Sequence, residues 1–177
     1  RPLVLIDRAL GQIPAVLSDP HAGMQQAVEQ LKEKGHTHIG YLSGPQETST
    51  GRQRLHAFKV ATRGMPTHIH HGSYRHREGY KGAIALLQEG VTALIAGDSM
   101  MTAGALEACH NAGKRIGEEI ALVGFDDFIY LRFQPSPISV VDQDVARMGE
   151  TATAKLIAAI NHKHQPEGEV LETRYIP

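Results

Sequence analysis

The sequence has no tryptophan, a single cysteine and no long apolar run among its 177 residues. Cys109 alone cannot form an internal disulfide, which excludes the disulfide-stapled secreted folds and fits a reducing compartment. A membrane-spanning helix needs about 20 apolar residues, and no segment approaches that length. The first residues also lack the charged-then-apolar pattern of a signal peptide. We therefore expect a cytoplasmic protein without a membrane anchor.

An excess of charge of either sign is missing too, because 18 Lys and Arg stand against 19 Asp and Glu, a formal net charge of −1. Any DNA-binding role must therefore reside outside this chain. The motifs G-x-G-x-x-G, G-x-x-x-x-G-K-[ST] and G-x-S-x-G are absent, which removes the dinucleotide, P-loop and hydrolase signatures. The sequence predicts a protein that is not an enzyme and uses no cofactor.

Histidine, in contrast, is frequent, with eleven copies. Four of them crowd one segment, namely His68, His70, His71 and His76. Neither H-E-x-x-H nor C-x-x-C accompanies them, so we interpret them as surface histidines and predict no metal site. Cys109 lies in an apolar helical stretch without the surroundings of a nucleophile, and we expect it to pack in the core.

Short apolar runs alternate with stretches of helical spacing. The runs predict strands at residues 3–6, 38–42, 93–96, 121–125 and 138–141. Helices are predicted around Met24–Leu31, Tyr80–Leu87 and Asp144–His162, where apolar residues recur on one face. Asp19-Pro20 supplies a cap and first-turn proline for the first helix, and Gly35 its left-handed end. This alternation is typical of a parallel sheet covered by helices on both faces, so the predicted fold class is α/β, doubly wound.

In such sheets, ligands bind beyond the carboxyl ends of the strands. Four of the five predicted strands are followed by carboxylates, which are Asp7, Asp98, Asp126 with Asp127, and Asp142. Carboxylates there suit acid/base catalysis, metal binding or the acceptance of hydrogen bonds from a polyhydroxylated or amine-bearing ligand. Asp98 and Asp127 are equally well explained as turn or cap residues, whereas Asp7 and Asp126 favour function. Arg54, near a helix start, can offer a planar fork to a carboxylate, a phosphate or vicinal hydroxyls.

A family resemblance rests on a series of segments in order along the chain. They are Leu5-Ile6-Asp7-Arg8, Asp19 with Gly23, Leu31 through Gly35-His36 to Ile39-Gly40, Gly44-Pro45, Arg52-Gln53-Arg54-Leu55 with Phe58, Ala96-Gly97-Asp98-Ser99-Met100 through Gly104-Ala105-Leu106, Ile120 through Asp127, and Pro137 through Gln143. Together they resemble the effector-binding domain of LacI-type bacterial transcription repressors, which is related to periplasmic sugar-binding proteins. The resemblance covers essentially the whole chain.

The resemblance implies an N-terminally truncated fold of the type I periplasmic-binding-protein-like kind. Residues 1–17 would be the end of the first lobe, 18–141 the second lobe, and 142–177 a crossover that returns to the first lobe. Such a domain is expected to sense a sugar, or alternatively a purine, between its lobes. Its regulator would act as a homodimer and bind operator DNA through a headpiece absent from this chain. The alternative is a periplasmic-type sugar-binding protein of a transport system.

Residue roles follow from the same resemblance. The residues implied around the ligand are Asp7, Thr50, Arg54, Tyr74 and Asp126, with Ser18 and Met148 at the edge of the cleft. The helix from Ser99 to Ala112 is similar to the family's dimerising helix, which places Met100, Met101 and Leu106 in the dimer interface.

Two departures from the family pattern stand out. Gly97 occupies a position where the family usually has asparagine, so one polar contact to the ligand is expected to be absent. The segment at residues 62–67 is also shorter than usual.

Overall fold

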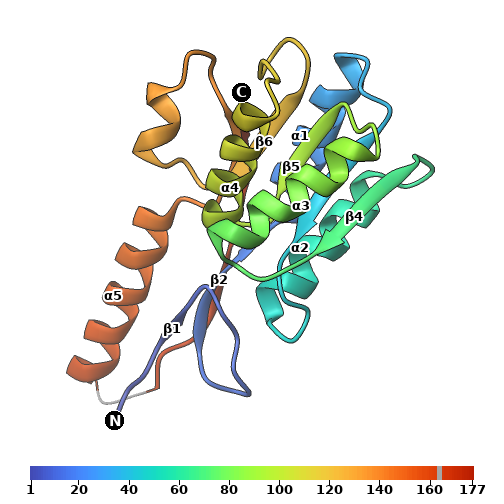
Figure 1. Cartoon of the computed structure of the whole chain (residues 1–177). Helices are drawn as coiled ribbons and strands as arrows, with labels where there is room; N and C mark the ends of the chain where they lie inside the picture. Colours follow the sequence, from blue (N-terminus) through green and yellow to red (C-terminus); the bar gives the residue numbers. More distant parts are fainter. Residues whose placement is uncertain (163–164) are drawn as a thin grey trace.

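The computed structural model describes residues 1–162 and 165–177, so residues 163 and 164 of the predicted crossover at 142–177 lie outside the described part. The chain forms two sheets (Figure 1). The larger has the strand order β4-β3-β5-β6-β7-β9, and the smaller has the order β1-β2-β8. None of the helices in the described ranges combines the length and the apolar character that crossing a bilayer requires.

The six-stranded sheet carries the main core. Its strands are β3 (Ile39–Ser43), β4 (Thr67–His71), β5 (Ala93–Ala96), β6 (Ala121–Phe125), β7 (Ser139–Asp142) and β9 (Arg174–Ile176). All neighbouring strands pair in parallel except β9, which runs antiparallel to β7. Every residue of β3 and β5 is buried, as expected for central strands with continuous apolar sequence.

Helices cover both faces of this sheet, which confirms the doubly wound prediction (Figure 1). On one face, α1 (His21–Glu33) and α2 (Ser49–Ala61) pack around Tyr41 and Phe58, whose rings stack with centroids 4.5 Å apart. On the other face lie α3 (His76–Gln88), α4 (Ser99–Asn111) and the 3₁₀ helix η1 (Ile129–Phe133). Cys109 is fully buried there, and burial raises the pKa of its thiol to about 11, which confirms the packing role.

The smaller sheet contains β1 (Leu5–Ile6), β2 (Ala15–Asp19) and β8 (Glu169–Glu172), and α5 (Val145–His162) packs against β1 and β2. The division into lobes stays a prediction, but two boundaries differ from it. Ser18 and Asp19 belong to β2 of the smaller sheet, and residues 174–176 join the larger sheet as β9. The second difference arises because β9 pairs with β7, which places the apolar Ile176 opposite Val140.

The start of α1 differs by one residue from the prediction. Pro20 is itself the N-cap, and the Asp19 carboxylate accepts the backbone N–H of His21 at 2.9 Å. The left-handed end at Gly35 is confirmed by its φ of +85°.

Helices α3 and α4 approach each other closely because glycines stand at their contact. A Cβ atom on Gly104 would lie 2.1 Å from the His76 carbonyl oxygen and 2.5 Å from the Tyr80 nitrogen. A Cβ atom on Gly79 would lie 2.5 Å from Cα of Met101. Both contacts are to backbone, which cannot rotate away, so the helix pair depends on the absence of side chains here.

We expect Gly104→Ala to lower the free energy of unfolding by about 3 kcal/mol, because overpacking forces the helix backbones apart. Gly149→Ala in α5 is the matched control, since nothing lies within 4 Å of the position that its methyl group would take. That control should stabilise the protein by about 0.5–1 kcal/mol through helix propensity alone. Urea denaturation of both variants measures the difference, and equal effects would contradict the close-packing argument.

Candidate functional site

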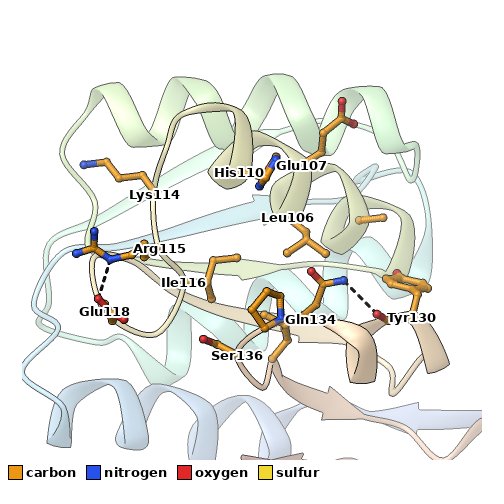
Figure 2. Close-up of a pocket in the computed structure, with 13 residues that line it drawn as sticks. Leu106, Glu107, His110, Lys114, Arg115, Ile116, Glu118, Tyr130, Gln134 and Ser136 are labelled. Atoms are coloured by element: carbon orange, nitrogen blue, oxygen red, sulfur yellow. Dashed lines mark hydrogen bonds and ion pairs between the residues drawn. The ribbon is translucent and has the colours of Figure 1, made fainter.

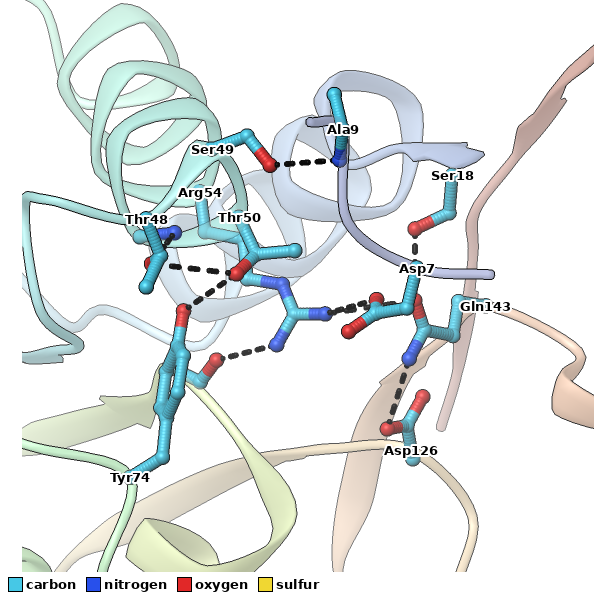
Figure 3. A network of polar contacts seen from close by, with 12 residues as sticks. Asp7, Ala9, Ser18, Thr48, Ser49, Thr50, Arg54, Tyr74, Asp126 and Gln143 are labelled. Carbon is cyan, nitrogen blue, oxygen red and sulfur yellow. Dashed lines mark hydrogen bonds and ion pairs between the residues drawn. The ribbon is translucent and has the colours of Figure 1, made fainter. Parts of the chain in front are cut away.

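Polar side chains from both sheets meet beyond the strand ends of the larger sheet (Figure 3). Asp7 follows β1, Asp126 follows β6, and Gln143 follows β7. Ser18 comes from β2, and Arg54 from the second turn of α2. Because parallel strands present their carboxyl ends at one edge, residues far apart in the sequence become neighbours here.

Arg54 is the centre of this network, with only 5% of its surface exposed. Its Nη1 donates to the Gly97 carbonyl oxygen at 2.9 Å, and its Nη2 donates to Asp7 Oδ1 at 3.2 Å. The flat guanidinium also lies over the Phe125 ring, with Cζ 4.0 Å from the ring centroid. A buried guanidinium needs such partners, since an unpaired charge in the interior costs several kcal/mol.

Gln143 joins Arg54 to Asp126. Its Oε1 accepts from Ser18 Oγ at 2.7 Å and from Arg54 Nη2 at 3.4 Å, and its Nε2 donates to Asp126 Oδ2 at 3.1 Å. Sequence reasoning missed this residue because it looked for carboxylates at the strand ends. The available signal was its position directly after Asp142 at the end of an apolar strand.

Asp126 is held in an unusual state. Its φ of +66° lies in the left-handed region, which aspartate tolerates better than most residues but which is uncommon outside turns and functional sites. Its Oδ1 is buried and has no hydrogen-bond partner among the described residues. Burial raises the pKa of this carboxyl to about 6, although Arg54 and Gln143 act in the opposite direction.

Thr50 and Tyr74 flank the network on its other side (Figure 3). The Tyr74 hydroxyl donates to Thr50 Oγ1 at 3.2 Å, and Thr48 Oγ1 caps α2 by accepting from the Gly51 nitrogen at 3.0 Å. The Tyr74 ring also lies near two guanidinium groups, with the Cζ of Arg54 5.9 Å from its centroid. An aromatic face beside donors and acceptors suits a sugar ring or a planar base.

The structure brings six of the seven predicted ligand residues together. They are Asp7, Ser18, Thr50, Arg54, Tyr74 and Asp126. Met148 is not among them, because it is fully buried in the small cluster of Val16, Ala152 and Leu171. That ligands contact these six residues stays a prediction.

Two other strand-end aspartates, Asp98 and Asp127, have structural roles. Asp98 is the N-cap of α4 and accepts the backbone N–H of Met101 at 2.8 Å, and burial raises the pKa of its carboxyl. Asp127 is exposed and forms an ion pair with Arg132. Among residues 1–162 and 165–177, no three His, Cys, Asp or Glu side chains gather closely enough to hold a metal ion.

The predicted dimer residues divide between surface and core. Met100 is 48% exposed, but Met101, one position along α4, is fully buried in the core, so its predicted place in the interface is wrong. Consecutive helical residues point about 100° apart, which separates the two side chains. Leu106 lines a groove of about 620 Å³ between α4 and the segment from η1 to β7 (Figure 2).

Fold and site together define an α/β domain of two parallel-dominated sheets whose polar network lies at the strand ends. The sequence profile described as "Periplasmic binding protein-like domain" matches residues 28–177. The chain therefore belongs to the periplasmic binding protein-like domain family, in the group found in LacI-family transcriptional regulators.

Individual relatives agree with this placement. A crystal structure of a probable LacI family regulator from Corynebacterium glutamicum is similar, with 39% identity, a TM-score of 0.91, and coverage of 99% of this chain and 67% of that one. The Haemophilus influenzae repressor PurR is 30% identical over 93% of this chain and 51% of its own length. The ribose operon repressor of Halalkalibacterium halodurans is 30% identical over 92% of this chain and 50% of its own length. The chain thus spans about half the length of the curated relatives it matches.

The raised pKa of Asp126 predicts a pH-dependent stability. Because the folded protein holds this proton more tightly than the unfolded chain does, the contribution is full at low pH and is lost as the pH rises through about 6. Between pH 4 and pH 7.5, we expect the wild type to lose about 2 kcal/mol of unfolding free energy relative to Asp126→Asn. Urea denaturation at both pH values checks this. Asp127→Asn is the exposed control, and a wild-type profile parallel to that of Asp126→Asn would refute the assignment.

Proposed function

We propose that this chain is the effector-binding and dimerisation domain of a LacI-type DNA-binding transcriptional regulator. The observation that carries the proposal is the network of Asp7, Arg54, Gln143 and Asp126, which joins the two sheets at the strand ends. An effector that binds these groups changes how the two sheets are held together. Such a change can be transmitted to DNA binding only if the effector has different affinities for the two states.

The chemistry of the network favours a small neutral ligand. Asp126 accepts hydrogen bonds, Arg54 donates them, and Tyr74 offers a flat ring. Relatives supply two candidate classes, since one is a ribose operon repressor and another is the repressor PurR. We propose a sugar as the effector, and a purine as the second candidate. The protein would act in the cytoplasm, without catalysis and without a cofactor.

A transport protein of the periplasmic sugar-binding kind is the competing function. It would use the same lobes and the same polar network. The complete gene product distinguishes the two, because a helix-turn-helix segment excludes transport, whereas a cleaved signal peptide favours it.

Thermal-shift measurements on the full-length protein test the effector assignment. The panel consists of D-ribose, D-glucose, D-galactose, maltose, their phosphate esters, adenine, guanine and hypoxanthine. A ligand present at about 100 times its Kd adds about 2.7 kcal/mol, which raises the Tm by about 5–10 °C for a domain of this size. We expect a neutral sugar to do so, and Asp126→Ala to remove at least half of the shift.

Asp127→Ala is the matched control, because this neighbouring carboxylate is exposed and pairs only with Arg132 among the contacts described. Retained shift in Asp126→Ala would move the binding site elsewhere. A shift by a purine would keep the regulator and replace the sugar. No shift with any compound would refute the effector assignment.

Dimerisation is proposed through the face formed by α4 and η1. Phe133 is 78% exposed and directly precedes Gln134, which lines the groove of Figure 2. Met100 is 48% exposed at the start of α4. The groove combines apolar lining with charges of both signs, including Glu107, Lys114 and Arg115. A face that carries a projecting ring, a groove and both charges can be complementary to a second copy of itself, as a two-fold dimer requires.

We expect the double variant Met100→Glu with Phe133→Glu to be monomeric. Each protomer would then have to bury two carboxylates in the apolar part of the interface, which costs more than the dimer contact gains. Light scattering of the full-length protein measures the mass. Val60→Glu serves as the control, since Val60 is a partly exposed apolar residue on α2, away from this face. An unchanged mass in the double variant would reject the interface.

A further inference from the structure

The hydrogen bonds of the Gln143 side chain go to residues that, under the proposed function, bind the effector. Its carbonyl end accepts from Ser18 at 2.7 Å and from Arg54 at 3.4 Å, and its amide end donates to Asp126 at 3.1 Å. The side chain is buried with 5% exposure. The amide therefore presents one acceptor and one donor side by side, between the guanidinium and the carboxylate (Figure 3).

The same side chain also connects the two sheets. Ser18 lies in β2 of the smaller sheet, whereas Asp126 follows β6 of the larger one. Two further contacts run parallel to this connection, from Arg54 to Asp7 and from the Ala9 nitrogen to Ser49 Oγ at 3.2 Å. Gln143 thus joins the two sheets in the way that an effector bound between them would have to join them.

Asp126 retains one oxygen for which the described residues supply no donor. Its Oδ1 is buried and unpartnered, while Oδ2 is bonded to Gln143. A buried unpartnered acceptor destabilises the protein until a donor reaches it. A ligand that donates to both oxygens would therefore satisfy Asp126 better than Gln143 does.

We propose that the Gln143 amide is an internal stand-in for the effector, which must displace it from Arg54 and Asp126 in order to bind. This inference rests on the proposed function. It also defines the ligand chemistry, because the displacing group must offer a donor beside an acceptor, as two vicinal hydroxyls of a neutral sugar do. A phosphate or carboxylate group offers acceptors only and adds negative charge next to Asp126, so neither group can take the place of the Gln143 amide.

Gln143→Met tests the proposal, because methionine has a similar length and forms no comparable hydrogen bond. Isothermal titration with the four neutral sugars named above and their phosphate esters is carried out on the wild type and the variant. Removing the internal competitor raises the fraction of protein that is ready to bind, so we expect the Kd for the bound sugar to fall several-fold, up to about tenfold. Because a phosphate adds negative charge near Asp126, the phosphate esters should bind both proteins more weakly than the parent sugars.

A matched control is Gln53→Met, an exposed glutamine beside Arg54 on α2, which should leave the Kd unchanged. If Gln143→Met does not fold, Gln143→Asn replaces it, since an amide one methylene shorter cannot span the same partners and should also bind more tightly. Thermal unfolding without sugar provides an independent readout, in which the variant should melt below the wild type.

The outcomes separate the two claims. Weaker or unchanged sugar binding in the variant, with binding in the wild type, overturns the stand-in role and makes Gln143 a positioning residue or a bystander, while the proposed function stands. Tighter binding of a phosphate ester than of its neutral parent sugar to the wild type overturns the ligand chemistry. Absence of sugar binding in both proteins overturns the proposed sugar effector and the stand-in role together.

Discussion

Burial of the Arg54 charge is the constraint on which the site depends. A guanidinium with 5% exposure cannot leave its donors unpaired, and no single element of the fold supplies enough acceptors. Its partners therefore come from the ends of β1, β5 and β7, and its flat face rests on Phe125 at the end of β6. One side chain thus fixes the mutual positions of four strand ends. Gly97 contributes by having no Cβ, since one would lie 2.5 Å from the Leu42 carbonyl oxygen and 3.2 Å from the Tyr41 hydroxyl.

Backbone conformation helps to explain why aspartates stand beyond these strand ends. Asp7, Asp126 and Asp144 all have positive φ, between +54° and +69°. Each follows a strand at the point where the chain turns sharply, and aspartate tolerates this conformation because its short polar side chain can bond locally. The residue type that tolerates the backbone conformation of the turn is therefore also one whose carboxylate can pair with a guanidinium. The strand-end carboxylates in the network have a conformational reason and an electrostatic reason to be there.

The sequence predicted those elements that bury the most apolar surface. The central strands and α1, α3 and α5 followed from their apolar spacing, whereas β2, β4, β8 and β9 were missed. Strand β4, with the sequence Thr-His-Ile-His-His, lies at the sheet edge and is mostly half-buried, so its hydrophobic pattern is weak. Strand β9 has three residues and depends on pairing with β7, a contact between distant segments. Local sequence contains little information about such pairings.

For the site, sequence alone could not separate aspartates that look alike. Asp98 and Asp126 both follow buried strands, but α4 begins directly after Asp98, and that carboxylate is used as the helix cap. No helix begins directly after Asp126, so its carboxylate does not cap a helix and instead accepts a hydrogen bond from Gln143. In the same way, Met100 and Met101 differ only in helical phase, which a stripe of apolar residues does not resolve by itself. The distinction in each case comes from the element that follows or from the turn of the helix.

The charges of the network indicate how selectivity arises. Arg54 and Asp7 form an ion pair, and Asp126, with a pKa of about 6, adds at most one further negative charge. So small a net charge gives little long-range attraction for any ligand, and discrimination must come from hydrogen bonds made at short range. Buried donors and acceptors reject a ligand that fails to pair with them much more strongly than an apolar wall rejects one of the wrong size. Because the groups that would recognise the ligand also join the two sheets, recognition and conformational change would rest on the same few hydrogen bonds.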